Sequence, residues 1–396
     1  MRKDLTAQIQ SLDVAEIQRS IRFALAQKRS ERKELDRLFD ELSVNVDQIK
    51  DSSANVYENQ KMYGSITSTS SSSYLHQLLD NYQLRLANNV KEAEVYQAVN
   101  TTSFLTLKMN AVIDWLDLRF TVDTNVCMFY KEPKACSYIK AFITRSTGTR
   151  HYIAKDESQI TQDGMSFTIR LHDVQNKKDL KKITDLLQKQ YGAKIELMTI
   201  EAIELSFDLY GGDSSAVVIK LHKAMQYPQT ARLFRVYKTK GTQRDIPKSM
   251  KELYDLLQSG YNIGVGDHRF DEFCVRLYFK RTDKGGQPLP QKQHRARIEI
   301  TLKKSIFDHE VVDRNIANLS QLIKFGFKKM QFTKLSKRAT FKEKDVYYTQ
   351  VKPFGKGSTC AMSVNRHKRF LLNSIATNGT LNEAKRLAVK ALSQKF

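Results

Sequence analysis

The sequence predicts an α+β protein in which an antiparallel sheet is flanked by helices, with a helical region at the N-terminus. Two observations favour this fold class. Segments that alternate apolar and polar residues, with the period of two typical of strands, are interleaved with helical segments, but without a regular strand–helix–strand repeat. In addition, no glycine-rich phosphate loop follows any predicted strand, so a doubly wound parallel sheet is not expected.

Residues 1–100 are predicted to form the helical N-terminal region. Between Leu12 and Ile49, apolar residues recur at intervals of three and four among charged residues, which predicts an amphipathic helix or helical hairpin. A helix packed on its own domain and a dimerising coiled coil both fit this spacing. A segment rich in serine and threonine, Tyr63 to Tyr74, is interpreted as a flexible linker, and a further helix is predicted for Leu75 to Tyr96.

A central α+β domain is expected from residue 110 to residue 310. Its predicted strands are 111–124, 151–154, 166–171, 195–210 with a break midway, 231–238, 274–280 and 296–302. Its predicted helices are 178–191, 215–225 and 250–260, and a glycine turn is expected at Tyr261 to Gly264. Residues 311–396 are expected to form a basic, helical C-terminal region with helices at 311–325 and 381–395.

The charge of the chain predicts a polyanionic partner. The 65 lysines and arginines exceed the 43 aspartates and glutamates, giving a net charge of +22. Such a field favours nucleic acid first and an anionic membrane surface second. No apolar run approaches the roughly 20 residues that span a bilayer, so no membrane partner is expected.

The N-terminus and the cysteines predict a cytoplasmic protein. The first residues lack the apolar segment of a signal peptide. The four cysteines are scattered without C-x-x-C spacing, which predicts reduced thiols and no cysteine zinc site.

Successive basic stretches with interleaved phenylalanine and tyrosine are the predicted nucleic-acid contacts. Cations would bind phosphates and the aromatic rings would stack on bases, although a solvated basic face is the plainer interpretation of any single stretch. The predicted contacts are Arg232, Arg235, Lys238, Arg295, Lys303, Lys304, Lys328, Lys329, Lys334, Lys337 and Arg338.

Carboxylates are the candidate metal ligands. The eight histidines stand alone, without spacing that would place two imidazoles on one ion. Glu204 and Asp208 lie four apart on one predicted strand and therefore on one face, and Glu299 lies on another strand. Such hard oxygen donors suit Mg²⁺ or Mn²⁺, although pairing of these acids with arginines is the alternative. Asp114 and Asp117, which flank Trp115, are weaker candidate ligands and fit better as polar positions at a strand edge.

A tyrosine among cations is the candidate nucleophile. On the predicted strand 274–280, Tyr278 shares a face with Arg276 and Lys280. Neighbouring cations favour the phenolate, which could attack a DNA phosphate and retain the 5′ end covalently. Tyr237 lies in a similar basic strand and is a competing candidate, whereas no G-x-S-x-G motif supports serine hydrolase chemistry.

The order of these features resembles the trans-acting replication initiators of rolling-circle plasmids, a group with relatives among filamentous-phage replication proteins and conjugative relaxases. Two of this chain's residues depart from the family pattern: Phe279 stands where the family often has aspartate, and Glu204 stands where aspartate is common. The matching segments are Ile113 to Leu116, Ile203 to Asp208, Tyr261 to Gly264, Arg276 to Lys280 and Arg297 to Glu299.

The resemblance implies a nickase that cleaves one strand at a replication origin and later rejoins it without ATP. Tyr278 would be the nucleophile, and Arg276, Lys280 and Arg297 would neutralise charge on the phosphate. The implied ligands of Mg²⁺ or Mn²⁺ are Glu204, Asp208 and Glu299. The implied partners are an origin hairpin or inverted repeat that is single-stranded at the nick, a second copy of the chain and a host helicase.

Two further functions fit the composition. A non-catalytic DNA-binding regulator would need the same basic surfaces but no convergent site. An RNA-binding protein ranks behind both, because no recognised RNA-binding signature occurs in the sequence.

Overall fold

The computed structural model describes residues 91–148, 151–161, 164–172, 174–227, 233–238, 242–267, 271–283, 286–351, 353 and 374–396. The predicted helix between Leu12 and Ile49, the predicted linker at 63–74 and most of the predicted helix at 75–96 lie outside these residues. A helix over 91–101 is the first described element.

Nine antiparallel strands form one sheet, which confirms the predicted α+β class. Their order across the sheet is β2-β3-β1-β4-β9-β8-β7-β5-β6. The strands are β1 (Lys108–Val122), β2 (Tyr152–Thr161), β3 (Gly164–His172), β4 (Thr199–Tyr210), β5 (Phe234–Tyr237), β6 (Arg244–Asp245), β7 (Asn262–Val265), β8 (Phe273–Lys280) and β9 (Arg295–Lys303). A separate pair joins β10 (Thr333–Leu335) to β11 (Ile375–Thr377).

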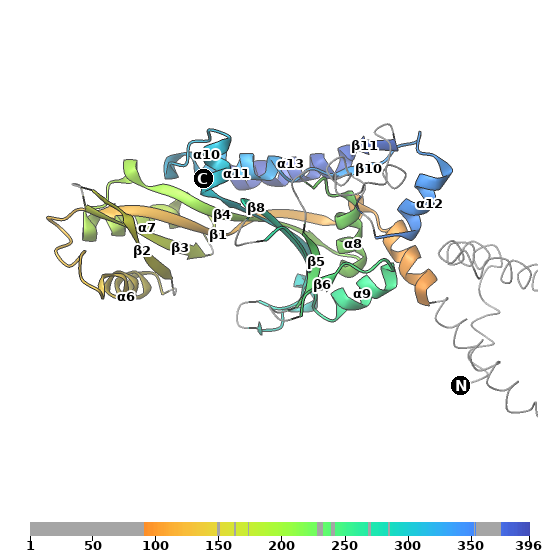
Figure 1. Ribbon diagram of the computed structural model, residues 1–396, viewed down its shortest axis with the longest axis horizontal. Coiled ribbons are helices and arrows are strands. Elements are labelled where there is room, and N and C mark those ends of the chain that lie inside the picture. Colours follow the sequence, from red (N-terminus) through yellow and green to blue (C-terminus); the bar gives the residue numbers. More distant parts are fainter. Residues whose placement is uncertain are drawn as a thin grey trace, which may run out of the picture.

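Helices cover the apolar face of this sheet. α8 (Ser214–Ala224) packs on β8 and β9, α11 (Leu319–Lys328) on β4, and α13 (Gly379–Ser393) on β1. In Figure 1, α10 (Lys304–His309), α11 and α13 run along one side of the long strands, while α8 and α9 (Met250–Gln258) lie beside the β5–β6 end. The remaining helices are α6 (Ala135–Thr147), α7 (Lys177–Tyr191) and α12 (Phe341–Thr349).

Period-two alternation explains how the sheet divides into two faces. In β9, Ile298, Ile300 and Leu302 are fully buried, and they alternate with Arg297, Glu299 and Thr301. Facing side chains at matched register extend the apolar layer into β8 and β4. The helices therefore bury one face, and the polar residues of the same strands gather on the other.

Helix ends follow side-chain signals in the sequence. The carboxylate of Asp213 accepts hydrogen bonds from the backbone amides of Ser215 and Ala216 and begins α8. α12, which was not predicted from the sequence, begins with a capping box in which Thr340 and Glu343 each bond the other's backbone amide. That Thr-x-x-Glu spacing was a usable signal.

Three predicted elements were wrong. The expected strand 195–210 begins at Thr199 and has no break, because residues 195–197 form a 3₁₀ turn. The segment after Tyr261 is not a glycine turn, because residues 262–265 form β7 and pair with both β5 and β8. The predicted helix 311–325 is broken, because Val311 has a φ of 53° and a short 3₁₀ turn, Ile316–Asn318, separates α10 from α11. α6 was also missed.

Among the helices that the structure describes, none combines the length and the apolar character needed to cross a membrane.

Gly326 lets α11 approach the sheet closely. A β-carbon at this position would lie 2.8 Å from Leu302 Cδ1 and closer still to Leu205 Cδ1, and both leucines are fully buried. We expect Gly326→Ala to lower the free energy of unfolding by about 1–3 kcal/mol, the usual cost of overpacking a core.

Gly379, the first residue of α13, provides the matched control, because a β-carbon there meets nothing within 4 Å. Urea unfolding of both variants should show a loss for Gly326→Ala and none for Gly379→Ala. Equal midpoints for the two would contradict this account of the α11 contact.

Candidate functional site

The polar residues of β4, β8 and β9 share one surface. β9 pairs with β4 so that Arg297 lies opposite Asp208, and it pairs with β8 so that Glu299 lies opposite Arg276 and Arg297 opposite Tyr278. Directly opposite residues in an antiparallel pair point to the same face. The predicted residues of β8 and β9 therefore do lie together, next to the acids of β4.

A β-bulge in β1 brings Asp114 to this surface. The flanking residues Ile113 and Trp115 pair with consecutive residues of β4, so Asp114 is the extra residue between two pairs. The buried residues on either side, Ile113 and Leu116, are consequently three apart instead of two. Because a bulge redirects side chains, Asp114 and Trp115 both lie on the polar face. The interpretation of Asp114 as a mere strand-edge position was wrong.

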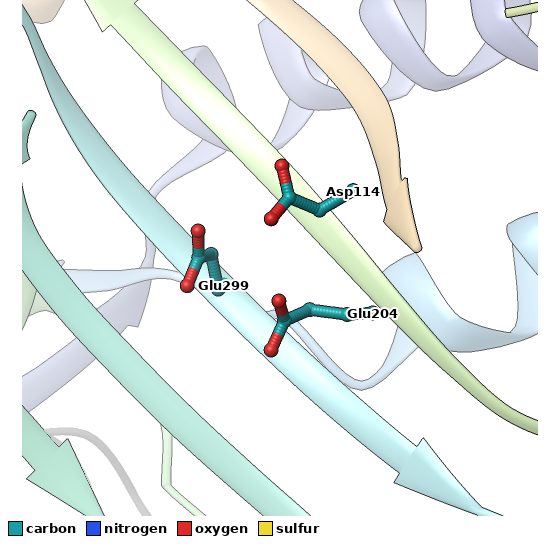
Figure 2. Close-up of side chains that lie close together, drawn as sticks. All are labelled: Asp114, Glu204 and Glu299. Carbon is teal, nitrogen blue, oxygen red and sulfur yellow. The ribbon is translucent and has the colours of Figure 1, made fainter. Parts of the chain in front are cut away.

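Three carboxylates from three adjacent strands converge. One oxygen each from Asp114 of β1, Glu204 of β4 and Glu299 of β9 lies within 4.8 Å of the others. Figure 2 shows the three side chains pointing toward one another. Glu204 is 5% exposed and Glu299 is fully buried, so these two carboxylates lie beneath the surface of the polar face, whereas the Asp114 side chain is 32% exposed.

Two arginines surround this acidic cluster. Arg276 bonds Glu299 through both Nε and Nη2, the Nε contact being 2.5 Å, and its Nη2 lies 3.7 Å from Glu204 Oε1. Arg297 Nη1 lies 2.9 Å from Asp114 Oδ1 and 3.4 Å from Glu299 Oε1. The cations offset the repulsion among three carboxylates that would otherwise oppose folding.

Asp208 lies outside the cluster. Its two oxygens accept bonds from Arg297 Nε at 2.5 Å and Nη2 at 2.7 Å. Arg295 Nε also lies 3.0 Å from Asp208 Oδ2, within ion-pair distance but without hydrogen-bond geometry. Of the three predicted ligands, Glu204 and Glu299 come together, whereas Asp208 instead orients Arg297, and Asp114 takes the third place.

The phenol of Tyr278 is bonded to the acidic cluster. Its hydroxyl donates a hydrogen bond of 2.7 Å to Glu299 Oε1, and the guanidinium of Arg276 lies 5.1 Å from the centre of its ring. Burial raises the pKa of Tyr278 above its usual value, and the charge of Glu299 raises it further, against the opposing effect of Arg297 and Arg276.

Tyr237 approaches the same arginine from β5. Its ring lies against Gly264 of β7, where a β-carbon would be only 2.6 Å from Tyr237 Cε1, so a glycine is required for this packing. Burial raises the pKa of Tyr237, while the charge of Arg276 lowers it. Both candidate tyrosines therefore lie beside Arg276, but the hydroxyl of Tyr278 is bonded directly to one of the three acids.

The carboxylates differ in how readily they ionise. Burial raises the pKa of Glu204 to about 7, and the charge of Glu299 adds to this effect. Burial also opposes ionisation of Asp114, but Arg297, Lys280 and Arg276 outweigh it and lower the pKa of Asp114. Burial lowers the pKa of Lys280, and the neighbouring Arg297 lowers it further.

The donor set fits a metal ion. All three groups are carboxylates, each with two oxygens, and the hydroxyl of Thr301 donates a 2.8 Å bond to Glu204 Oε2, which orients that side chain. A cation among the carboxylates would favour the ionised form of Glu204 that burial disfavours. Asp114, Glu204 and Glu299 could therefore hold a metal ion.

The predicted basic contacts divide between the two sides of the sheet. Arg235 lies in β5 and Lys238 directly follows that strand. Arg295 and Lys303 are the first and last residues of β9, and Lys304 comes next in the chain. By contrast, Lys328 ends α11, which packs on the apolar face. Of the other predicted contacts, Arg232 lies outside the described residues, and Lys329, Lys334, Lys337 and Arg338 follow α11.

Neither the known protein-family models nor the curated protein sequences include a match to this chain.

The raised pKa of Glu204 makes stability depend on pH. In the unfolded chain this carboxyl ionises near pH 4.5, but in the fold it ionises near pH 7, so the fold binds the extra proton between these values. Without added metal, the free energy of unfolding should therefore fall by about 3 kcal/mol as pH rises from 4.5 to 7.

Glu204→Gln should remove this pH dependence of the free energy of unfolding, because glutamine keeps the shape of the side chain but does not ionise. Urea unfolding at intervals from pH 5 to pH 8 measures how the free energy of unfolding changes with pH in the wild type and in Glu204→Gln. Parallel curves for the wild type and Glu204→Gln would contradict the assignment to Glu204.

Proposed function

We propose that the protein cleaves and rejoins one DNA strand through a covalent 5′-phosphotyrosine, as a replication initiator or relaxase does. The observation that supports this most directly is the hydrogen bond from Tyr278 to Glu299, which joins a candidate nucleophile to the convergent carboxylates Asp114, Glu204 and Glu299. The net charge of +22 supports a nucleic-acid substrate.

In the proposed reaction, the phenol oxygen of Tyr278 attacks the scissile phosphorus and the bond from phosphorus to the 3′ oxygen breaks. The phenol proton passes to Glu299, which already accepts its hydrogen bond, and is then returned to the departing 3′ oxygen. The 5′ phosphate remains on the tyrosine. Rejoining is the reverse attack by the 3′ hydroxyl, so no other energy source is needed.

The other side chains have electrostatic roles in this proposal. Arg276 and Arg297, both within reach of Glu299, would neutralise charge on the phosphate. Asp114, Glu204 and Glu299 would hold Mg²⁺ or Mn²⁺, since hard oxygen donors suit these ions. When bound there, the ion would polarise a phosphate oxygen.

The alternative is a non-catalytic DNA-binding regulator. One observation favours it: burial and the charge of Glu299 raise the pKa of Tyr278, which weakens the phenol as a nucleophile. The two functions differ in whether a covalent bond to DNA forms.

A covalent-capture experiment separates them. The full chain is incubated with Mn²⁺ and a pool of random-sequence single-stranded oligonucleotides labelled at the 3′ end, and is then denatured in SDS. Cleavage by a tyrosine leaves the labelled 3′ fragment attached to the protein through its 5′ phosphate. We expect a labelled protein band that EDTA abolishes.

Single-stranded binding without any labelled protein, with either Mg²⁺ or Mn²⁺, would support the regulator and overturn the nickase. A label that forms equally in EDTA would overturn the role of the carboxylates as metal ligands.

A further inference from the structure

An open groove of about 870 Å³ continues the polar face beyond the carboxylates. Trp115 and Asp117 of β1, Arg170 of β3 and Thr301 of β9 line it, and Lys303 and Lys304 follow at the end of β9. The nickase proposal assigns no role to this groove.

A cation–π pair of Arg170 and Trp115 lies in the groove. The guanidinium of Arg170 lies 3.7 Å from the centre of the Trp115 ring. Two bonds of 2.7 Å, from Nε and Nη2 of Arg170 to the two oxygens of Asp117, hold the guanidinium at its edge. Edge bonding leaves the face turned away from the indole for a ligand, and the Arg170 side chain is 38% exposed.

The groove is suited to an anion at one end. Its acids Glu201 and Asp308 both pair with Arg314, at 2.8 and 3.1 Å. Asp117 is likewise bonded to Arg170. Two arginines thus pair with three acids, and Lys303 and Lys304 add two more positive charges at the lining.

The groove is continuous with the acidic cluster. Trp115 follows Asp114 directly, and Thr301 both lines the groove and donates a hydrogen bond to Glu204. Along β9, Lys303 is four residues beyond Glu299 on the same face, a span of about 13 Å. A strand whose phosphate lies at the carboxylates would therefore extend along the groove.

We propose that this groove binds single-stranded DNA next to the cleaved phosphate, with a base stacked on the Arg170–Trp115 pair and a phosphate held by Lys303 and Lys304. The proposal rests on the proposed function in taking DNA as the substrate. A guanidinium plane on an aromatic ring stacks with any base, and lysines at a fixed distance hold the backbone. The ligand class is thus a nucleotide in an unpaired strand.

Trp115 is the only tryptophan in the chain, so its fluorescence reports on this groove alone. The test titrates the full protein, in EDTA, with oligothymidylate of about 20 nucleotides, longer than a typical single-strand site. The matched control is an abasic strand of the same length and charge. We expect oligothymidylate to quench the fluorescence, and the abasic strand to bind more weakly without quenching.

Variants then separate stacking from charge, with binding followed by polarisation of a labelled strand. Arg170→Ala should weaken binding of oligothymidylate about tenfold, the usual size of one stacking contact, and should change binding of the abasic strand less. Arg170→Lys keeps the charge beside Asp117 but not the plane, so it should resemble Arg170→Ala with oligothymidylate.

Equal quenching by both strands, or no quenching by either, would overturn the proposal without any variant being needed. Wild-type affinity in Arg170→Lys would also overturn it. Because EDTA prevents the proposed cleavage, quenching does not depend on nicking. Failure of covalent capture and failure of this titration are therefore distinguishable.

Discussion

Replacing Tyr278 with phenylalanine is expected to reduce covalent capture of labelled DNA at least about a thousandfold. Phenylalanine keeps the ring that lies 5.1 Å from Arg276, but it removes the oxygen that would bond phosphorus. The hydrogen bond to Glu299 is lost as well, so the unfolding midpoint of the variant should be measured beside its activity. Binding of single-stranded DNA should persist.

Tyr237→Phe is the matched control for this result. It also removes one hydroxyl beside Arg276 and keeps a ring against Gly264. We expect this variant to form the labelled adduct. If Tyr237→Phe loses the adduct and Tyr278→Phe keeps it, the nucleophile is Tyr237 and the assignment to Tyr278 is wrong.

Removing Arg297 is expected to cause the largest loss of stability. Its side chain is 3% exposed and bonds Asp208, Asp114 and Glu299 at once. Arg297→Met fills part of the space but leaves the buried carboxylates of Asp208 and Glu299 without this cation. Breaking a buried ion pair in this way costs about 3–5 kcal/mol, which urea unfolding at pH 7 would measure.

Arg386 offers a comparison outside the sheet. It forms a two-bond pair with Glu383 on α13, but both side chains are more than half exposed. Arg386→Met should leave the unfolding midpoint unchanged, since solvent screens exposed pairs. A similar loss in both variants would show that burial of Arg297 does not determine its contribution.

Much of the site could be predicted because strand periodicity is local. Arg276 and Tyr278 alternate with apolar residues, as do Arg297 and Glu299, and this pattern alone places each pair on one face. Strand pairing could not be derived in the same way. β4 and β9 are distant in sequence, and only their pairing brings Glu204 next to Glu299.

Asp114 was ranked below Asp208 as a ligand because an unbroken alternation was expected along its strand. Counting by twos along β1 assigns Asp114 and Trp115 to opposite faces, whereas the bulge gives them the same face. A signal was present, since the apolar residues Ile113 and Leu116 lie three apart within an extended segment. Asp208 was chosen instead because its spacing from Glu204 fits a regular strand, which β4 is at that point.

β7 was missed for a related reason. Gly264 and Gly266 are typical of a turn, and the four-residue strand between Tyr261 and Gly266 is too short for a clear alternation. The glycine serves the packing of Tyr237 against the strand, which depends on a residue 27 positions earlier in the chain. Local propensity carries no information about such a distant neighbour.

The one-residue bulge in β1 determines which side chains reach the polar face of the sheet. Asp114 and Trp115 are consecutive, and both face the same surface only because one residue interrupts the pleat between Ile113 and Leu116. Deleting Asp114 would restore the regular pleat and leave Trp115 on the polar face, but it would remove one of the three acids from the cluster. The distance between the acidic cluster and the Arg170–Trp115 pair is thus determined by the pairing register of β1, because Asp114 and Trp115 are consecutive residues of one strand. A loop between the two sites would tolerate insertions that a paired strand does not.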